Sequence, residues 1–282
     1  MKDKSLYVEL LIQEMRFRNY SARTINTYGQ LLTNVENYFQ LSLDKISSQQ
    51  IKDYLLHLIT IKKISTSMVN QCISAYKILQ TDVFKREWQA IKIKRPRREK
   101  KLPVVLSLKE VEHLISATRN IKHKAILMLA YSSGLRRQEI RLIKPSAIDS
   151  PRMQVHVALG KGKKDRYTIL STKALEILRL YYKHEKPSCF LFEAQGKKGK
   201  PLAENTLNNI VKKSAIKAGI KKHISFHTLR HCFATHLLEK GVNLRLIQQF
   251  LGHNSLKTTS VYLHLANVDL TTVTSPLDSM DV

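Results

Sequence analysis

The chain has 282 residues and is strongly basic, with 48 lysines and arginines against 22 aspartates and glutamates. Its length suits one large domain or two ordinary ones, and a hydrophobic content of 43% supplies a sizeable core. A formal net charge of +26 indicates a polyanionic partner such as nucleic acid, the plain alternative being a merely solvated basic protein. The longest apolar stretch, 125–131, is too short to cross a bilayer, which takes about 20 residues.

Targeting and redox signals point to the cytoplasm. Residues 1–13 carry acidic side chains and lack the long apolar segment of a signal peptide. The three cysteines, Cys72, Cys189 and Cys232, are too few and odd in number for a disulfide framework. We therefore expect a protein of the reducing cytoplasm.

The first hundred residues predict a helical domain. Ser21 carries an N-cap side chain, and the apolar residues after it recur at helical spacing: Ile25, Tyr28, Leu32, Val35 and Phe39. Similar apolar patterns cover Ile51–Ile59 and Met68–Leu79. We therefore assign residues 1–91 to a helical N-terminal domain.

Residues 92–103 differ in composition from the chain on either side. They are rich in lysine and arginine, contain Pro96 and Pro103, and hold few apolar side chains. This composition is typical of an interdomain linker. The linker either lies along DNA phosphates or forms a solvated tether, and the sequence does not choose between the two.

A second domain begins at residue 104 and mixes helices with a small sheet. Residues 107–110 form a capping box ahead of a helix, and a further helix over 122–133 ends at Gly134. Alternating apolar residues on both sides of a glycine-rich turn predict a β-hairpin within 153–170.

The rest of the second domain returns to helical patterns. Gly219, Gly241 and Gly252 lie where helix ends are expected. The expected helices lie around Thr172–His184, Asn205–Ala218, Phe226–Lys240, Leu244–Leu251 and Ser255–Leu265. The chain is therefore predicted to be mainly α with a small β-sheet in its second domain, an α+β fold.

Because the charge indicates a nucleic-acid partner, we ask which side chains could cut and rejoin a DNA strand. Cutting a DNA backbone without losing the bond energy requires a nucleophile, a cationic clamp on the phosphate and an acid for the 5′ leaving oxygen. Arginine suits the clamp because its planar fork matches phosphate oxygens and stays charged. A lysine of lowered pKa can serve as the acid, and a tyrosine can form a covalent ester.

The second domain holds such a set of side chains. One arginine lies just after a helix end. The other lies three residues after a histidine, on the same helix face. The lysine lies between two glycines of the hairpin turn. Another histidine ends a helix, nine residues before a tyrosine. Each has an ordinary alternative as a solvated charge, a cap or a core side chain. The candidate catalytic residues are Arg136, Lys161, His227, Arg230, His253 and Tyr262.

In their order and spacing these motifs resemble the tyrosine recombinase, or phage integrase, family. The match covers roughly residues 104–270, and the stretches 227–241 and 251–259 are most similar to Xer and integron members. The N-terminal helices, with the stretch 21–28, resemble the family's core-binding domain. The separated motifs are Gly134-Leu-Arg, Gly160-Lys-Gly, His227-Thr-Leu-Arg-His, Leu251-Gly-His and Tyr262. The long insertion typical of integron integrases is absent, so the subgroup stays open.

The resemblance implies a phosphate clamp. Arg136 and Arg230 would grip the scissile phosphate, and His253 would hydrogen-bond a nonbridging oxygen. Glu139 lies where the family often has an acidic residue that orients this histidine, so we regard it as supporting rather than catalytic.

The resemblance also implies how the protons move. Lys161 would protonate the 5′ leaving oxygen, and His227 would assist proton transfer from the nucleophile. Tyr262 would form the 3′-phosphotyrosyl bond, which keeps the bond energy, so no cofactor or metal is needed.

At the scale of the whole protein, the resemblance implies a site-specific recombinase or integrase. Two domains would form a C-shaped clamp around double-stranded DNA that carries paired recombination sites. A homotetramer, or a heterotetramer with a related recombinase, would exchange strands through a Holliday junction. The segment from about residue 265 to the C-terminus would pack against a neighbouring subunit.

Three further interpretations compete with the recombinase. The first is a metal enzyme, because four potential metal ligands cluster on one predicted helix (His227, His231, Cys232 and His236), but the His-Glu-x-x-His pattern is absent. The plain interpretation of His231 and His236 is helix packing and hydrogen bonding. The second is a DNA-binding relative without activity, and the third is a topoisomerase of the same chemistry.

Overall fold

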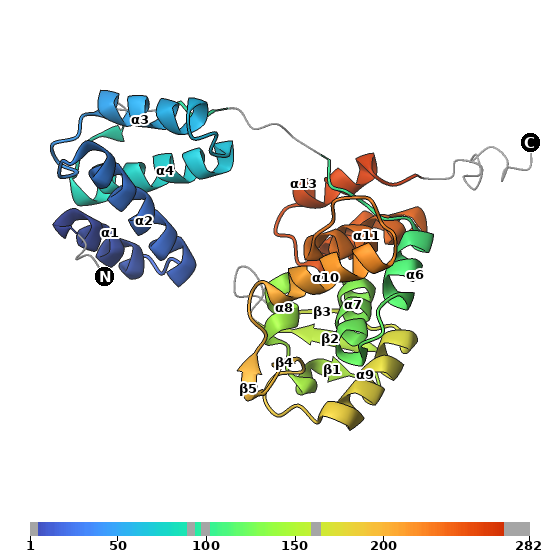
Figure 1. Cartoon of the computed structure of the whole chain (residues 1–282). Coiled ribbons are helices and arrows are strands. Elements are labelled where there is room, and N and C mark those ends of the chain that lie inside the picture. The colour runs from blue at the N-terminus through green and yellow to red at the C-terminus, as the bar shows by residue number, and fades with distance from the viewer. Residues whose placement is uncertain (1–4, 89–93, 97–101, 159–164, 268–282) are drawn as a thin grey trace, which may run out of the picture. The chain divides into compact units, whose positions relative to one another are not determined.

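The computed structural model describes residues 5–88, 94–96, 102–158 and 165–267. The chain divides into two compact units, Met1–Lys100 and Lys101–Val282. Each unit has its own apolar core. In Figure 1 the first unit runs from blue to teal and the second from green to red.

The first unit is helical, as the sequence predicts. Its helices are α1 (Leu6–Phe17), α2 (Ala22–Phe39), α3 (Ser48–Thr60), α4 (Thr66–Ile78) and the π-helical turn η1 (Leu79–Val83). The N-cap role of Ser21 is confirmed, since its hydroxyl accepts a hydrogen bond from the backbone N–H of Thr24 at 3.1 Å. The apolar stripe of α2 packs against α1 and α4.

The second unit combines helices with two small sheets (Figure 1). Its helices are α6 (Leu108–Ser116), α7 (Ile121–Ser133), α8 (Arg137–Leu142), η2 (Pro145–Ala147), α9 (Thr172–Glu185), α10 (Thr206–Lys217), α11 (Phe226–Glu239), α12 (Leu244–Leu251), α13 (Leu256–Thr259) and η3 (Ser260–His264). Its strands are β1 (Ile148–Asp149), β2 (Gln154–Val157), β3 (Arg166–Ile169), β4 (Glu193–Ala194) and β5 (Lys197–Pro201). The α+β class is confirmed.

The predicted hairpin is confirmed in its strands. Strands β2 and β3 are antiparallel, with Val157 opposite Arg166, and β1 adds to the other edge of β2. Val155 and Val157 are buried, whereas Gln154 and His156 are partly exposed, so the alternation marks one core face. The glycine-rich turn lies outside the described residues. The pair β4–β5 is not predicted by the sequence pattern.

One expected helix is wrong in form. The segment Ser255–Leu265 is a four-residue α-helix, α13, followed by the 3₁₀-helix η3. Thr259 is fully buried and its hydroxyl bonds the ring of His253 at 2.9 Å. The tighter turn thus brings Tyr262, with 2% of its surface exposed, into the core around α11.

Among the described residues, no helix has both the length and the apolar character that crossing a membrane requires.

Candidate active site

The site begins where α7 stops. Gly134 ends this helix with φ of +59°, a conformation that L side chains rarely adopt. A Cβ atom at this position would lie 2.3 Å from Cδ1 of Phe233, so only glycine fits against α11. The chain then reverses, and Arg136 becomes the N-cap residue of α8.

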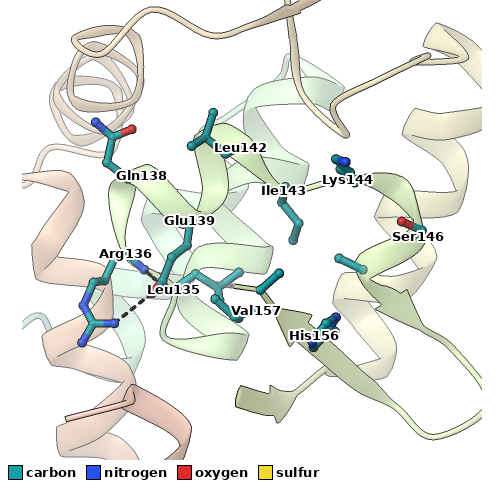
Figure 2. Close-up of a pocket in the computed structure, with 12 residues that line it drawn as sticks. Leu135, Arg136, Gln138, Glu139, Leu142, Ile143, Lys144, Ser146, His156 and Val157 are labelled. Atoms are coloured by element: carbon teal, nitrogen blue, oxygen red, sulfur yellow. Dashed lines mark hydrogen bonds and ion pairs between the residues drawn. The ribbon is translucent and has the colours of Figure 1, made fainter. Parts of the chain in front are cut away.

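Arg136 is held by its own helix and by a distant helix end. Glu139 accepts hydrogen bonds from the Arg136 backbone N–H at 2.7 Å and from its Nη1 at 2.8 Å. Nη2 of Arg136 donates to the carbonyl oxygen of Gly252 at 2.9 Å. Figure 2 shows Arg136 and Glu139 beside a pocket that Lys144 and His156 also line. The pocket has a volume of about 530 Å³.

Arg230 is the largest fully buried side chain of the described residues, with 1% of its surface exposed. Its Nη1 donates to the carbonyl of Gly134 at 2.7 Å, and its Nη2 donates to the carbonyl of Leu251 at 2.6 Å. Burial and the positive charge of Arg136 lower the pKa of Arg230. A guanidinium still remains protonated at neutral pH.

His253 connects Arg230 to the segment that carries the tyrosine. Its Nε2 lies 3.0 Å from Nη2 of Arg230, and its Nδ1 lies 2.9 Å from the hydroxyl of Thr259. Because the arginine can only donate, Nε2 accepts and Nδ1 carries the proton. Burial, with the charges of Arg230 and Arg136, lowers the pKa of His253 to about 3, so the ring is neutral at pH 7.

Tyr262 lies next to this histidine, with the two rings nearly parallel and their centroids 6.5 Å apart. Its hydroxyl is 3.2 Å from Nδ1 of His231. Burial raises the pKa of Tyr262, and the charges of Arg230 and Arg136 oppose this shift. Nearby guanidinium groups therefore favour the phenolate needed for attack.

His227 lies one helical turn before His231 on α11. The two rings meet edge to face, with centroids 4.8 Å apart. Desolvation and the charges of Arg230 and Arg136 lower the pKa of His227, so its ring is neutral at pH 7. The residue as a whole is exposed, in contrast to Arg230.

Comparison with known proteins matches both units to models of one family. The model named Phage integrase family matches residues 104–268, and the model named Phage integrase, N-terminal SAM-like domain matches residues 8–90. The chain belongs to the phage integrase family. The resemblance noted in the sequence is thereby confirmed.

Curated relatives of this integrase carry recombinase names. A putative integrase/recombinase of Sinorhizobium fredii is 35% identical over 94% of this chain and 86% of its own length. The tyrosine recombinase XerD of Oceanobacillus iheyensis is 34% identical over 90% of this chain and 91% of its own length. The expectation of a tyrosine-type site-specific recombinase is confirmed, and neither the silent DNA-binding relative nor the topoisomerase is favoured.

A solved structure shares the fold. The XerH site-specific recombinase, solved bound to its difH substrate before cleavage, superimposes with a TM-score of 0.71 at 23% identity. The match covers 94% of this integrase and 81% of that chain.

Five of the six residues predicted for catalysis come together in the second unit of the integrase. Arg136, Arg230, His253 and Tyr262 are joined directly or through the carbonyls at the ends of α7 and α12. The fifth, His227, contacts His231, which in turn bonds the Tyr262 hydroxyl. Lys161 lies outside the described residues. Glu139, expected to orient a histidine, instead binds arginines with both carboxylate oxygens.

Two residues of the site are missed by sequence reasoning. The sequence predicts helix packing and hydrogen bonding for His231 but does not identify its partner, the Tyr262 hydroxyl; its place one turn after His227 is the available signal. Arg166, just after the hairpin turn, forms an ion pair with Glu139 at 2.7 Å. No pattern of residue spacing predicts that Arg166 pairs with Glu139, which lies 27 residues earlier in the chain.

The metal ligands considered on α11 have other partners. His236 bonds the hydroxyl of Tyr131 and the carbonyl of Leu106, each at 2.9 Å, as the packing interpretation predicts. The sulfur of Cys232 accepts from the Leu106 backbone N–H at 3.2 Å. Within the described part of the chain, no three His, Cys, Asp or Glu side chains gather as a metal site.

Proposed function

We propose that this integrase cuts and rejoins DNA through a 3′-phosphotyrosyl intermediate on Tyr262. The convergence of two arginines, a neutral histidine and this tyrosine from separate segments carries the proposal. A phosphodiester held by Arg136 and Arg230 would present its phosphorus to the Tyr262 hydroxyl.

The proposed reaction exchanges one ester for another. The Tyr262 oxygen bonds to phosphorus as the bond from phosphorus to the 5′ oxygen breaks. The phenolic proton leaves with help from His227, and Lys161 gives a proton to the 5′ oxygen. His253 would hydrogen-bond a nonbridging oxygen once the phosphate takes over Arg230 and the ring proton moves from Nδ1 to Nε2. Attack by a 5′ hydroxyl on the phosphotyrosine reverses the step, so rejoining needs no energy source.

The proposed partner is double-stranded DNA with paired recombination sites. Strand exchange through a Holliday junction takes four subunits, either copies of this chain or copies with a related recombinase. Residues 92–103 would link a core-binding domain to the catalytic domain, and the segment from about residue 265 would contact the neighbouring subunit. The site of action would be the nucleoid in the cytoplasm.

Covalent trapping on nicked DNA tests the proposal. The substrate is a nicked duplex whose binding site has been selected from random-sequence DNA with this chain. The native chain should form a covalent complex that survives denaturation, and Tyr262→Phe should form none while keeping its DNA affinity. Tyr182→Phe is the matched control, because this tyrosine is 46% exposed on α9. Trapping by Tyr262→Phe would overturn the proposal.

A further inference from the structure

Arg166 joins the two helix ends that build the site. Its Nη1 and Nη2 donate to the two carboxylate oxygens of Glu139, each at 2.7 Å. Its Nε donates to the carbonyl of Phe250 at 2.8 Å. One guanidinium, with 9% of its side chain exposed, thus binds the first turn of α8 and the last turn of α12.

The packing around Arg166 leaves little freedom. Gly252, which ends α12 with φ of +59°, lies so close that an added Cβ would be 2.7 Å from Cδ of Arg166. The same glycine gives its carbonyl to Arg136, and the next residue is His253. A shift of Arg166 would therefore move the carbonyl that aims Arg136 and the histidine that binds Arg230.

Arg166 also limits how far the Glu139 carboxylate neutralises the charge of Arg136. The Glu139 carboxylate accepts from both Arg136 and Arg166. Burial acts to raise the pKa of Glu139, but the hydrogen bonds and charge of Arg166, with those of Arg136, lower it to about 2. The carboxylate is therefore ionised at neutral pH, and without Arg166 its negative charge would pair with Arg136 alone.

We propose that Arg166 is a positioning residue for the phosphate clamp, which keeps Arg136 aimed and its charge available to the scissile phosphate. The inference rests on the proposed function. In the ranges that the structure describes, the hydrogen bonds of Arg166 go to Glu139 and Phe250 and not to Tyr262. Arg166 acts through Glu139 and through the end of α12.

The test measures single-turnover covalent trapping at saturating protein, together with DNA affinity, on the nicked duplex described above. Arg166→Ala should slow trapping by about a hundredfold while affinity changes by less than about threefold. Arg152→Ala is the matched control, since this arginine of the neighbouring β1–β2 turn has 78% of its side chain exposed and should leave the rate unchanged.

The diagnostic readout is the effect of Glu139→Gln. In the native background this change should slow trapping, because it loosens Arg136. Added to Arg166→Ala it should instead raise the rate by about tenfold, because it removes the charge that then neutralises Arg136. A purely structural role predicts further loss in both backgrounds. If Arg166→Ala fails to fold, Arg166→Gln serves in the same comparison, since its neutral amide can take the place of Nε beside the Phe250 carbonyl but is too short to reach Glu139.

Two outcomes overturn the inference. One is a slowing of less than about tenfold in the Arg166 variant, and the other is no gain from Glu139→Gln in that background. Either leaves the proposed function intact, provided that the native chain traps DNA and Tyr262→Phe does not. Absence of trapping by the native chain instead counts against the proposed function.

Discussion

Single residues of the site are tuned by burial beside arginines. Burial, followed by the positive charges of Arg230 and Arg136, lowers the pKa values of His227 and His253 and keeps these rings neutral. Neutral rings can accept and pass on protons at neutral pH, whereas charged rings would repel the clamp. His231 shares this environment, and burial together with His227 and Arg230 lowers its pKa to about 4.

This shift makes the stability of the integrase depend on pH through His231. In the unfolded chain a histidine binds a proton below about pH 6.5. In the folded chain the His231 ring stays neutral down to about pH 4. The free energy of unfolding should therefore fall as pH drops from about 6.5 to about 4. Urea unfolding at about pH 7 and about pH 5 should show a smaller loss for His231→Gln than for the native chain.

The control for this comparison is His184→Gln, at an exposed position of α9, which should keep the native pH dependence. An unchanged pH dependence in His231→Gln would contradict the shift.

Among the elements, the α7–α8 turn depends most on one residue. Gly134 combines a left-handed backbone with contact against Phe233. Gly134→Ala should destabilise the integrase by about 2–4 kcal/mol, from backbone strain of about 1 kcal/mol and overpacking of about 1–3 kcal/mol, and should slow trapping by displacing Arg136. Gly219→Ala, with φ of +68° but nothing within 4 Å, should cost only the backbone strain of about 1 kcal/mol.

Urea unfolding of both glycine variants measures the difference. Equal losses for the two would mean that the contact with α11 is unimportant.

Local patterns explain which elements the sequence could predict. The capping box of Ser107 and Glu110 and the alternation in β2 are encoded within a few residues, and both are present. Strand β4 has two residues, too few to show a period, so the pattern misses it. The 3₁₀ turn at Tyr262 also escapes prediction, because it follows from packing against α11.

The same limit applies to the site. Motif order could predict Arg136 and Arg230 without any geometry. It could not predict that Arg166 binds a carbonyl 84 residues away, since that contact exists only after α12 packs on β3.

For the molecule as a whole, charge governs DNA binding. The net charge of +26 predicts many phosphate contacts, each of which releases counterions. With six to ten contacts, affinity for duplex DNA should fall by about 10³–10⁵ between about 50 and 200 mM salt. Fluorescence anisotropy with labelled DNA measures this slope. A change of less than about tenfold would mean that few of the cationic side chains face DNA.

The position of the DNA adduct tests the central claim most directly. Trypsin leaves the residues after Lys257 as one peptide, 258–282, because no lysine or arginine follows, and Tyr262 is its single tyrosine. After trapping, nuclease treatment and trypsin digestion, mass spectrometry should find a nucleotide phosphate on Tyr262. An adduct on any other residue, or trapped DNA without an adduct in this peptide, would contradict the account.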